Sequence, residues 1–293
     1  MLALKFLWAP DPVAISLGSI SIYYYSLMFV IAFAGGLYLM KYMYKKEGVS
    51  VTHLDPLLLY MVVGTLLGAR LGEVFFYNWG YFQNNLLEII LPFKISEEGW
   101  KFVGFRGLAS HGAVIGITTA LYLYMRKFKY ASLLWLLDRI AITVALGGIF
   151  IRIGNFFNSE IVGKYTGSNF GVVFKNNGET LPRHPVQLYE SLGYFIVFII
   201  LFMFYKNTQK SKQEGFLLGL FFALLFSVRF LAEFVKESQG GFGEQLGYLS
   251  TGQWLSLPLI LLGIWLVVFS ARKKVSFEFT FSCVWYQTLQ VSQ

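Results

Sequence analysis

Cysteine and histidine are scarce in this sequence of 293 residues. Cys283 is the single cysteine, which excludes an internal disulfide and a metal cage built from cysteines. The histidines are His53, His111 and His184, too few to favour a multi-histidine metal centre. We therefore expect no metal site.

Charged residues are also few, at 14% of the sequence, whereas 56% is hydrophobic and the mean hydropathy is +0.58. A soluble domain carries about a quarter charged residues, so the deficit indicates lipid as the solvent for much of the surface. Aromatic residues make up 19%, which fits because tyrosine and tryptophan settle at membrane interfaces. The composition predicts an all-α membrane protein.

A helix needs roughly 20 apolar residues to cross the hydrocarbon core. Seven stretches reach that length: about Ile20–Met40, Pro56–Tyr77, Gly107–Met125, Ala131–Ile151, Pro185–Tyr205, Gly215–Val235 and Gly252–Ala271. Before the first, Pro10 and Pro12 interrupt short apolar runs and Lys5 is the only positive charge. That pattern is not typical of a cleaved signal peptide, so we expect the first span to stay in the mature protein.

Basic residues indicate the orientation of the spans. Clusters follow the first, third, fifth and seventh stretches: Lys41, Lys45 and Lys46; Arg126, Lys127 and Lys129; Lys206, Lys210 and Lys212; Arg272, Lys273 and Lys274. All four fall on one side, which we interpret as the cytoplasm, with the N-terminus outside and the C-terminus inside. The net charge of +8 is then a topology signal and needs no nucleic-acid partner.

The domain organisation expected from this topology is simple. Residues 1–274 form one seven-helix domain, and residues 275–293 form a cytoplasmic tail of unknown role. Two outer connections are long: residues 78–106 predict a loop or short interfacial helices, and residues 152–184 predict a small extracytoplasmic cap. No internal repeat is evident.

Polar residues gather at one depth of the predicted bundle, near its outer face. Ionisable groups at membrane depth usually mark a site or a pathway. The residues that share this depth are Tyr25, Arg70, Glu73, His111, Arg152, Asn155, Asn158, Glu160, His184, Gln187, Glu190, Arg229 and Glu233.

Each of these residues also has a purely structural interpretation. Arg70 with Glu73, and Arg229 with Glu233, have the spacing of intrahelical ion pairs. His111 alone is more often a hydrogen-bond partner between helices, and asparagines at a helix end are often caps. Asp138 and Arg139 lie near the cytoplasmic end, where we expect them to close a contact between helices. The coincidence of so many polar groups at one depth favours function.

The predicted cluster is rich in arginine, and guanidinium groups suit bidentate capture of phosphate. In a site open to lipid, a phospholipid headgroup is the obvious anion. The sequence has no serine elbow, Walker loop or metal-ligand set, so the nucleophile is expected on a substrate. A transporter or channel for an anionic solute is the alternative, since arginines can line its path. Against it, the inner halves of the spans are poor in charge.

Several motifs resemble those of the bacterial prolipoprotein diacylglyceryl transferases, from near Asp11 to about Arg272. The most specific is the run from Gly148 to Gly163, GIFIRIGNFFNSEIVG. The others, in order, are Asp11-Pro-Val13, Gly68-Ala-Arg-Leu-Gly72, Gly107-Leu-Ala-Ser-His-Gly112, Arg183-His-Pro-Val-Gln-Leu-Tyr-Glu190, Arg229-Phe-Leu-Ala-Glu-Phe234 and Leu249-Ser-Thr-Gly-Gln-Trp-Leu-Ser-Leu-Pro258.

The resemblance implies a seven-span protein of the bacterial cytoplasmic membrane with its active site toward the outer side. It implies transfer of diacylglyceryl from phosphatidylglycerol, a membrane lipid, to the lipobox cysteine of a prolipoprotein signal peptide, with release of glycerol 1-phosphate. The residues that the family treats as functional map onto Tyr25, His111, Arg152, Asn155, Glu160, Gly163, Arg229 and Glu233. The family often has arginine at Lys236, and lysine offers charge without a planar fork.

A mechanism follows as a hypothesis from these residue types. Arg152 and Arg229 hold the phosphate and stabilise the leaving group, and His111 is the candidate base for the thiol. Glu160 and Glu233 orient the arginines or accept the proton instead. Asn155, Tyr25 and Gly163 belong to substrate binding, with Asn155 and Tyr25 bonding the headgroup or holding the cap. No cofactor is required by this chemistry.

Overall fold

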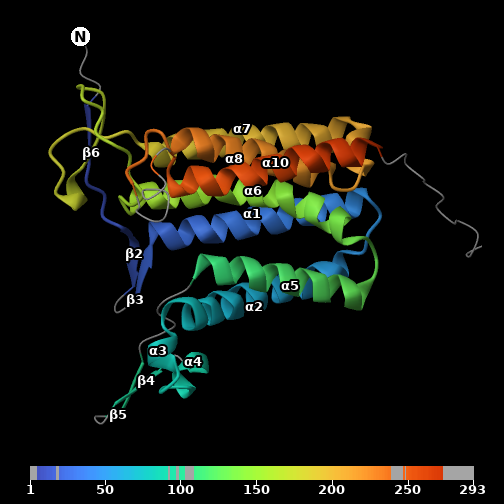
Figure 1. The fold of residues 1–293 in the computed structure, drawn as a ribbon, viewed down its shortest axis with the longest axis horizontal. Coiled ribbons are helices and arrows are strands. Elements are labelled where there is room, and N and C mark those ends of the chain that lie inside the picture. The colour runs from blue at the N-terminus through green and yellow to red at the C-terminus, as the bar shows by residue number, and fades with distance from the viewer. Residues whose placement is uncertain are drawn as a thin grey trace, which may run out of the picture. The chain divides into compact units, whose positions relative to one another are not determined.

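The computed structural model describes residues 5–17, 20–91, 93–96, 99–102, 109–238, 247 and 249–272 (Figure 1). The chain divides into two compact units. The first unit comprises Met1–Val30 with Val144–Gln293, and the second comprises Ile31–Thr143. The expected tail, residues 275–293, lies outside the described residues.

Long helices occupy the places expected from the apolar stretches. In the described chain they are α1 (Tyr24–Lys46), α2 (Leu54–Gly72), α5 (Ser110–Phe128), α6 (Leu133–Phe157), α7 (Val186–Asn207), α8 (Phe216–Ala232) and α10 (Thr251–Arg272). Five helices among these residues are long and apolar enough to cross a membrane: Tyr24–Lys46, Val51–Tyr77, Leu133–Phe157, Val186–Asn207 and Thr251–Ala271. Helix α8 is apolar but only 17 residues long. The prediction of a helical membrane protein is confirmed.

Short strands modify the all-α expectation. The N-terminal strand β1 (Lys5–Trp8) pairs in parallel with β6 (Gly171–Phe174). A hairpin of β2 (Val13–Leu17) and β3 (Ile20–Tyr23) precedes α1, so the helix begins at Tyr24 and not at Ile20. The alternating ISIY sequence of β3 explains the difference, because β-branched residues favour a half-exposed strand.

Smaller elements complete the chain. Helix α2 is preceded by η1 (Val51–His53) and continues into the π-helical turn η2 (Glu73–Tyr77). The connection after it holds the short helices α3 (Trp79–Phe82) and α4 (Leu87–Ile90) and the hairpin β4 (Phe93–Ser96)–β5 (Gly99–Phe102). The remaining turns are η3 (Lys175–Asn177) and η4 (Gln209–Lys212). Residue 107, the expected start of the third span, is outside the described residues.

Glycines set the packing of α2 against α5 in the second unit. Gly64 and Gly68 on α2 face Gly112 and Gly116 on α5 so closely that the backbones touch. A Cβ atom added to Gly68 would lie 2.7 Å from the Cα of Gly116. Small residues allow helices to approach in this way in lipid, where van der Waals packing replaces the hydrophobic driving force.

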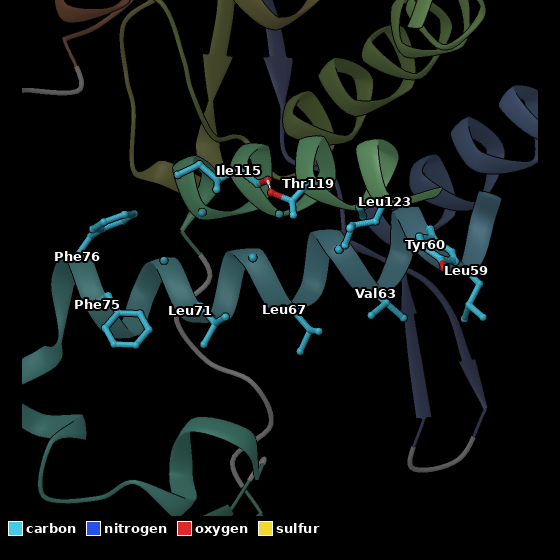
Figure 2. A pocket seen from close by; sticks show the side chains of 16 residues that line it. Leu59, Tyr60, Val63, Leu67, Leu71, Phe75, Phe76, Ile115, Thr119 and Leu123 are labelled. Carbon is cyan, nitrogen blue, oxygen red and sulfur yellow. Dashed lines mark hydrogen bonds between the residues drawn. The ribbon is translucent and has the colours of Figure 1, made fainter. Parts of the chain in front are cut away.

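An apolar groove runs along the α2–α5 pair. Its cavity volume is about 580 Å³, and its lining includes Leu67 and Leu71 from α2, Phe75 from η2, and Ile115 and Leu123 from α5. In Figure 2, Leu67 and Leu71 point in the same direction from α2, and Thr119 turns its hydroxyl back onto its own helix. The groove therefore offers apolar surface almost without polar groups.

Two charged clusters of the second unit have structural roles. Arg139 on α6 pairs with Glu47 after α1, with 2.6 Å between Nη2 and Oε2, which is the expected contact between helices. Arg70 does not pair with Glu73, contrary to one interpretation of their spacing. Its Nε donates to the Ile89 carbonyl oxygen at 3.1 Å, so it fastens the α3–α4 connection to the end of α2.

The close α2–α5 contact predicts a sharp effect of one methyl group. Gly68→Ala should destabilise the protein by about 1–3 kcal/mol, the usual range for overpacking, and lower its thermal unfolding midpoint in detergent. Gly80→Ala is the matched control, since a Cβ there meets nothing within 4 Å. Equal midpoints for the two variants would contradict the packing described here.

Candidate functional site

Arg152 lies in the last two turns of α6, which ends at Phe157, and it pairs with a carboxylate on α7. Its Nε lies 2.9 Å from Oε2 of Glu190, an ion pair that lacks the alignment of a hydrogen bond. The two side chains are 12% and 1% exposed, respectively. The guanidinium carbon lies 5.9 Å from the centre of the Tyr194 ring, one turn further along α7. Glu190 thus engages one edge of Arg152 and leaves its terminal amino groups for other partners.

A hydrogen-bonded relay leads from Arg152 to Glu160. Nη1 of Arg152 donates to Oδ1 of Asn155 at 3.3 Å, and Nδ2 of Asn155 donates to Oε1 of Glu160 at 2.7 Å. These bonds fix which end of the buried Asn155 amide faces the arginine. The structure therefore joins three of the predicted site residues directly.

Gly163 is placed where only glycine fits. Its N–H donates to the His184 carbonyl oxygen at 3.1 Å. A Cβ atom would lie 2.5 Å from that oxygen and 2.7 Å from Cγ2 of Val186. The loop after α6 is thereby pressed against the start of α7. This close approach explains glycine at the position in terms of packing.

Backbone pairing also ties the loop after α6 to the segment after α8. The N–H of Lys164 donates to the Val235 carbonyl oxygen at 2.8 Å, and the N–H of Glu237 donates to that of Val162 at 3.1 Å. The segments that carry Glu160 and Glu233 are consequently joined outside the long helices.

Arg183 connects three of the segments around this loop. Nη1 donates to the Gly163 carbonyl oxygen at 3.0 Å and pairs with Oε2 of Glu237 at 2.6 Å, while Nε donates to Glu179 at 2.8 Å. Burial opposes ionisation of Glu179, but hydrogen bonds from Tyr165 and Arg183 outweigh it and hold the pKa of this carboxyl below its ordinary value. Arg183 thus stays charged beside an ionised partner.

Glu233 does not pair with Arg229, so the intrahelical ion pair suggested by their spacing is wrong. Oε1 of Glu233 accepts from Nζ of Lys236 at 2.9 Å, and Oε2 accepts from the Ser250 hydroxyl at 2.8 Å. Gly252 leaves room for the carboxylate, because a Cβ there would collide with it. Glu233 therefore connects the end of α8 to the start of α10.

Among the described residues, Arg229 is left without a direct ion pair, although the Glu233 carboxylate one turn away is near enough to interact with it electrostatically. Within the described part of the chain it makes no ion pair or hydrogen bond, and its guanidinium carbon lies 5.9 Å from the Phe226 ring. Both Arg152 and Arg229 lie near the Tyr194 side chain, so the two arginines belong to one part of the first unit. Such an arrangement is suited to binding an anion.

The other predicted residues occupy different settings. The Tyr25 ring lies against Gly154, where a Cβ would be 2.8 Å from Cδ2, so Tyr25 borders Asn155. His111 is in the first turn of α5, in the second unit, and its side chain is outside what the structure describes. In the described part of the chain, no group of three or more His, Cys, Asp or Glu residues could hold a metal ion.

The sequence does not reveal the partners of two further residues near the site, Glu190 and Ser250. Glu190 stands out in the sequence as a polar residue in a span and as the end of the Arg183–Glu190 motif, but its pairing with Arg152 depends on how α6 and α7 pack. Ser250 had a local signal, because Ser250-Thr-Gly-Gln253 is a capping-box sequence at the start of a helix. The structure bears this out, since the N–H of Gln253 donates to the Ser250 hydroxyl at 3.1 Å and Oε1 of Gln253 accepts from the N–H of Ser250 at 2.9 Å.

Comparison with known proteins places this geometry in context. The family model described as prolipoprotein diacylglyceryl transferase matches residues 12–269. A phosphatidylglycerol–prolipoprotein diacylglyceryl transferase of Tolumonas auensis is 45% identical over 267 residues, covering 91% of this chain and 98% of its own. Proteins of the same name from Chloroherpeton thalassium and Bacteroides fragilis are 42% and 40% identical, each covering 93% of this chain and 97% and 98% of their own.

The buried ion pair predicts a non-additive effect on stability. Glu190→Leu should destabilise the protein by about 3–5 kcal/mol, because it leaves the Arg152 charge buried without a partner. The double variant Arg152→Met/Glu190→Leu should recover most of that loss, since no charge remains. Unfolding of both proteins in detergent measures the difference. A Glu190→Leu protein as stable as the unaltered chain would rule out the pair.

Proposed function

The chain belongs to the prolipoprotein diacylglyceryl transferase family, and from this membership we propose that it lipidates prolipoproteins. It is a transferase that moves the diacylglyceryl group of phosphatidylglycerol to a prolipoprotein. The acceptor is the thiol of the lipobox cysteine in the signal peptide, and the second product is glycerol 1-phosphate. This is the first step in maturation of a lipoprotein.

The observation that carries the site assignment is the electrostatic balance around Arg152 and Arg229. Glu190 neutralises Arg152, whereas Arg229 has no carboxylate partner among the described residues. The half-buried Arg229 guanidinium and the terminal amino groups of Arg152 therefore have no carboxylate in direct contact with them among the described residues. Guanidinium groups that are not engaged by a carboxylate can bind the phosphodiester of the lipid through charge-assisted hydrogen bonds.

The reaction breaks one bond and forms another at a glyceryl carbon. The cysteine thiolate attacks that carbon, the carbon–sulfur bond forms, and the carbon–oxygen bond to phosphate breaks with its electrons moving to oxygen. Negative charge grows on the departing phosphate, where fixed guanidinium groups stabilise the transition state more than the ground state. Arg229 and Arg152 take this role.

The remaining residues position these charges. Asn155 bonds the Arg152 guanidinium, and Glu160 bonds the Asn155 amide. Glu233, one turn after Arg229, ties the end of α8 to Ser250. Tyr25 and Gly163 border the same part of the first unit. His111 accepts the thiol proton in this proposal, because a thiol with a reference pKa of about 8.5 needs only modest activation by an imidazole.

Membrane placement follows from the charge pattern. We propose seven spans within residues 1–274, with the N-terminus outside, the C-terminus in the cytoplasm and residues 152–184 as an outer cap. The protein belongs to the bacterial cytoplasmic membrane, with its site toward the outer side. Lipid and signal peptide both enter sideways from the bilayer, and neither nucleic acid nor cofactor takes part.

The test is a transfer assay with purified protein. Labelled phosphatidylglycerol and a lipobox peptide should give a diacylglyceryl-peptide, and a peptide with serine in place of cysteine should give none. Arg229→Gln should lower the rate by roughly a hundredfold or more, the usual effect of removing a donor to developing charge. Arg126→Gln, which removes an exposed arginine from the end of α5, is the control and should keep normal turnover.

Two results would contradict the proposal. Absence of the lipidated peptide, with an active transferase alongside, would reject the reaction. Full activity of a folded Arg229→Gln protein would remove Arg229 from phosphate binding while leaving the reaction itself intact.

A further inference from the structure

The interactions around Arg152 close into a ring that begins and ends on α7. Glu190 pairs with Arg152, Arg152 bonds Asn155, and Asn155 bonds the Glu160 side chain. The ring closes through Gln187, whose Nε2 donates to the backbone carbonyl oxygen of Glu160 at 2.7 Å. Gln187 and Glu190 lie one turn apart on α7, so this helix contacts the relay at both of its ends, Arg152 and Glu160.

The turn that carries Glu160 has a strained backbone. Ser159 and Ile161, on either side of it, have positive φ angles of 54° and 56°. A β-branched residue such as Ile161 rarely adopts that conformation, and a strained residue costs of order 1–3 kcal/mol unless its surroundings hold it. The turn therefore depends on bonds from outside, and Gln187 supplies one from inside the bundle.

A glutamine at position 187 does not give the folded protein the greatest stability that this buried position allows. Its side chain is fully buried, at 0% exposure, and its Oε1 has no hydrogen-bond partner among the described residues. An unsatisfied buried amide oxygen is unfavourable, and an apolar side chain of similar size would avoid that penalty. The useful part of the side chain is its single bond to Glu160.

We propose that Gln187 is a positioning residue for the transfer reaction, acting through Glu160; this inference rests on the proposed function. With the Glu160 turn held, its carboxylate orients the Asn155 amide, and the amide oxygen then faces Arg152. If the turn relaxes, the Asn155 amide is free to rotate and present its NH₂ group to the guanidinium. Arg152 then loses its alignment toward the phosphate.

The first experiment compares Gln187→Met with Ser191→Ala. Ser191 lies on the same helix and bonds the α6 backbone at Ile149, but it stands outside the ring. Gln187→Met should lower kcat/KM roughly tenfold to a hundredfold, as a small misplacement of reacting groups does. Its unfolding midpoint should stay within about 3 °C of the unaltered protein. Ser191→Ala should retain full activity.

A double-mutant comparison shows whether Gln187 acts through Glu160. In a Glu160→Gln background, Gln187→Met should lower kcat/KM less than about twofold, since residues of one network are not additive. An equal loss in both backgrounds would overturn the proposal, as would Gln187→Met activity equal to that of Ser191→Ala. A Gln187→Met protein that fails to fold would also overturn it, because Gln187 would then be structural.

A readout independent of transfer separates this inference from the proposed function. The Glu160 N–H donates to the Asn155 carbonyl oxygen at 3.1 Å and should exchange faster in Gln187→Met than in the unaltered protein or Ser191→Ala. Unchanged exchange would overturn the positioning role. A faster rate in a protein without transfer activity would instead locate the failure in the proposed function.

Discussion

The ion pair between Arg152 and Glu190 is the interaction on which the site depends. It joins α6 to α7 among apolar side chains, and it engages the arginine along one edge only. The relay through Asn155 to Glu160 begins from the same guanidinium. Loss of the Glu190 carboxylate would therefore leave the Arg152 guanidinium without its ion pair. It would also weaken the hydrogen bonds that align the loop after α6, because these begin from the same guanidinium.

The helices could be predicted from the sequence because lipid imposes a simple rule. A chain in hydrocarbon must satisfy its backbone internally over a long apolar stretch, and such stretches are visible without a structure. The predicted start of the first span, about Ile20, lies four residues before the observed start of α1 at Tyr24. Apolar character alone does not distinguish a helix from a strand in the ISIY segment of β3. The predicted end of the second span, Tyr77, agrees with the structure, because the helical path of α2 continues through η2 to Tyr77.

Site residues could be selected from their depth, but their partners could not. The spacing of Arg229 and Glu233 suggests a pair, and only the fold reveals that Lys236 and Ser250 compete successfully for the carboxylate. Gly163 is explained by the backbone of His184, which lies 21 positions later in the chain and becomes a neighbour through folding. Gln187 could be selected as a polar residue at the shared depth and as part of the Arg183–Glu190 motif, but its bond to the distant Glu160 carbonyl oxygen could not be predicted.

The charge of Arg229 has a consequence for the membrane around the protein. A ligand that binds only the folded state stabilises that state by mass action, and here the ligand is also a bulk component of the solvent. In the proposed reaction, an anionic lipid is both the substrate and the ion that pairs with Arg229. On this proposal, depletion of the lipid removes the reactant and also the stabilisation that its binding gives to the folded enzyme.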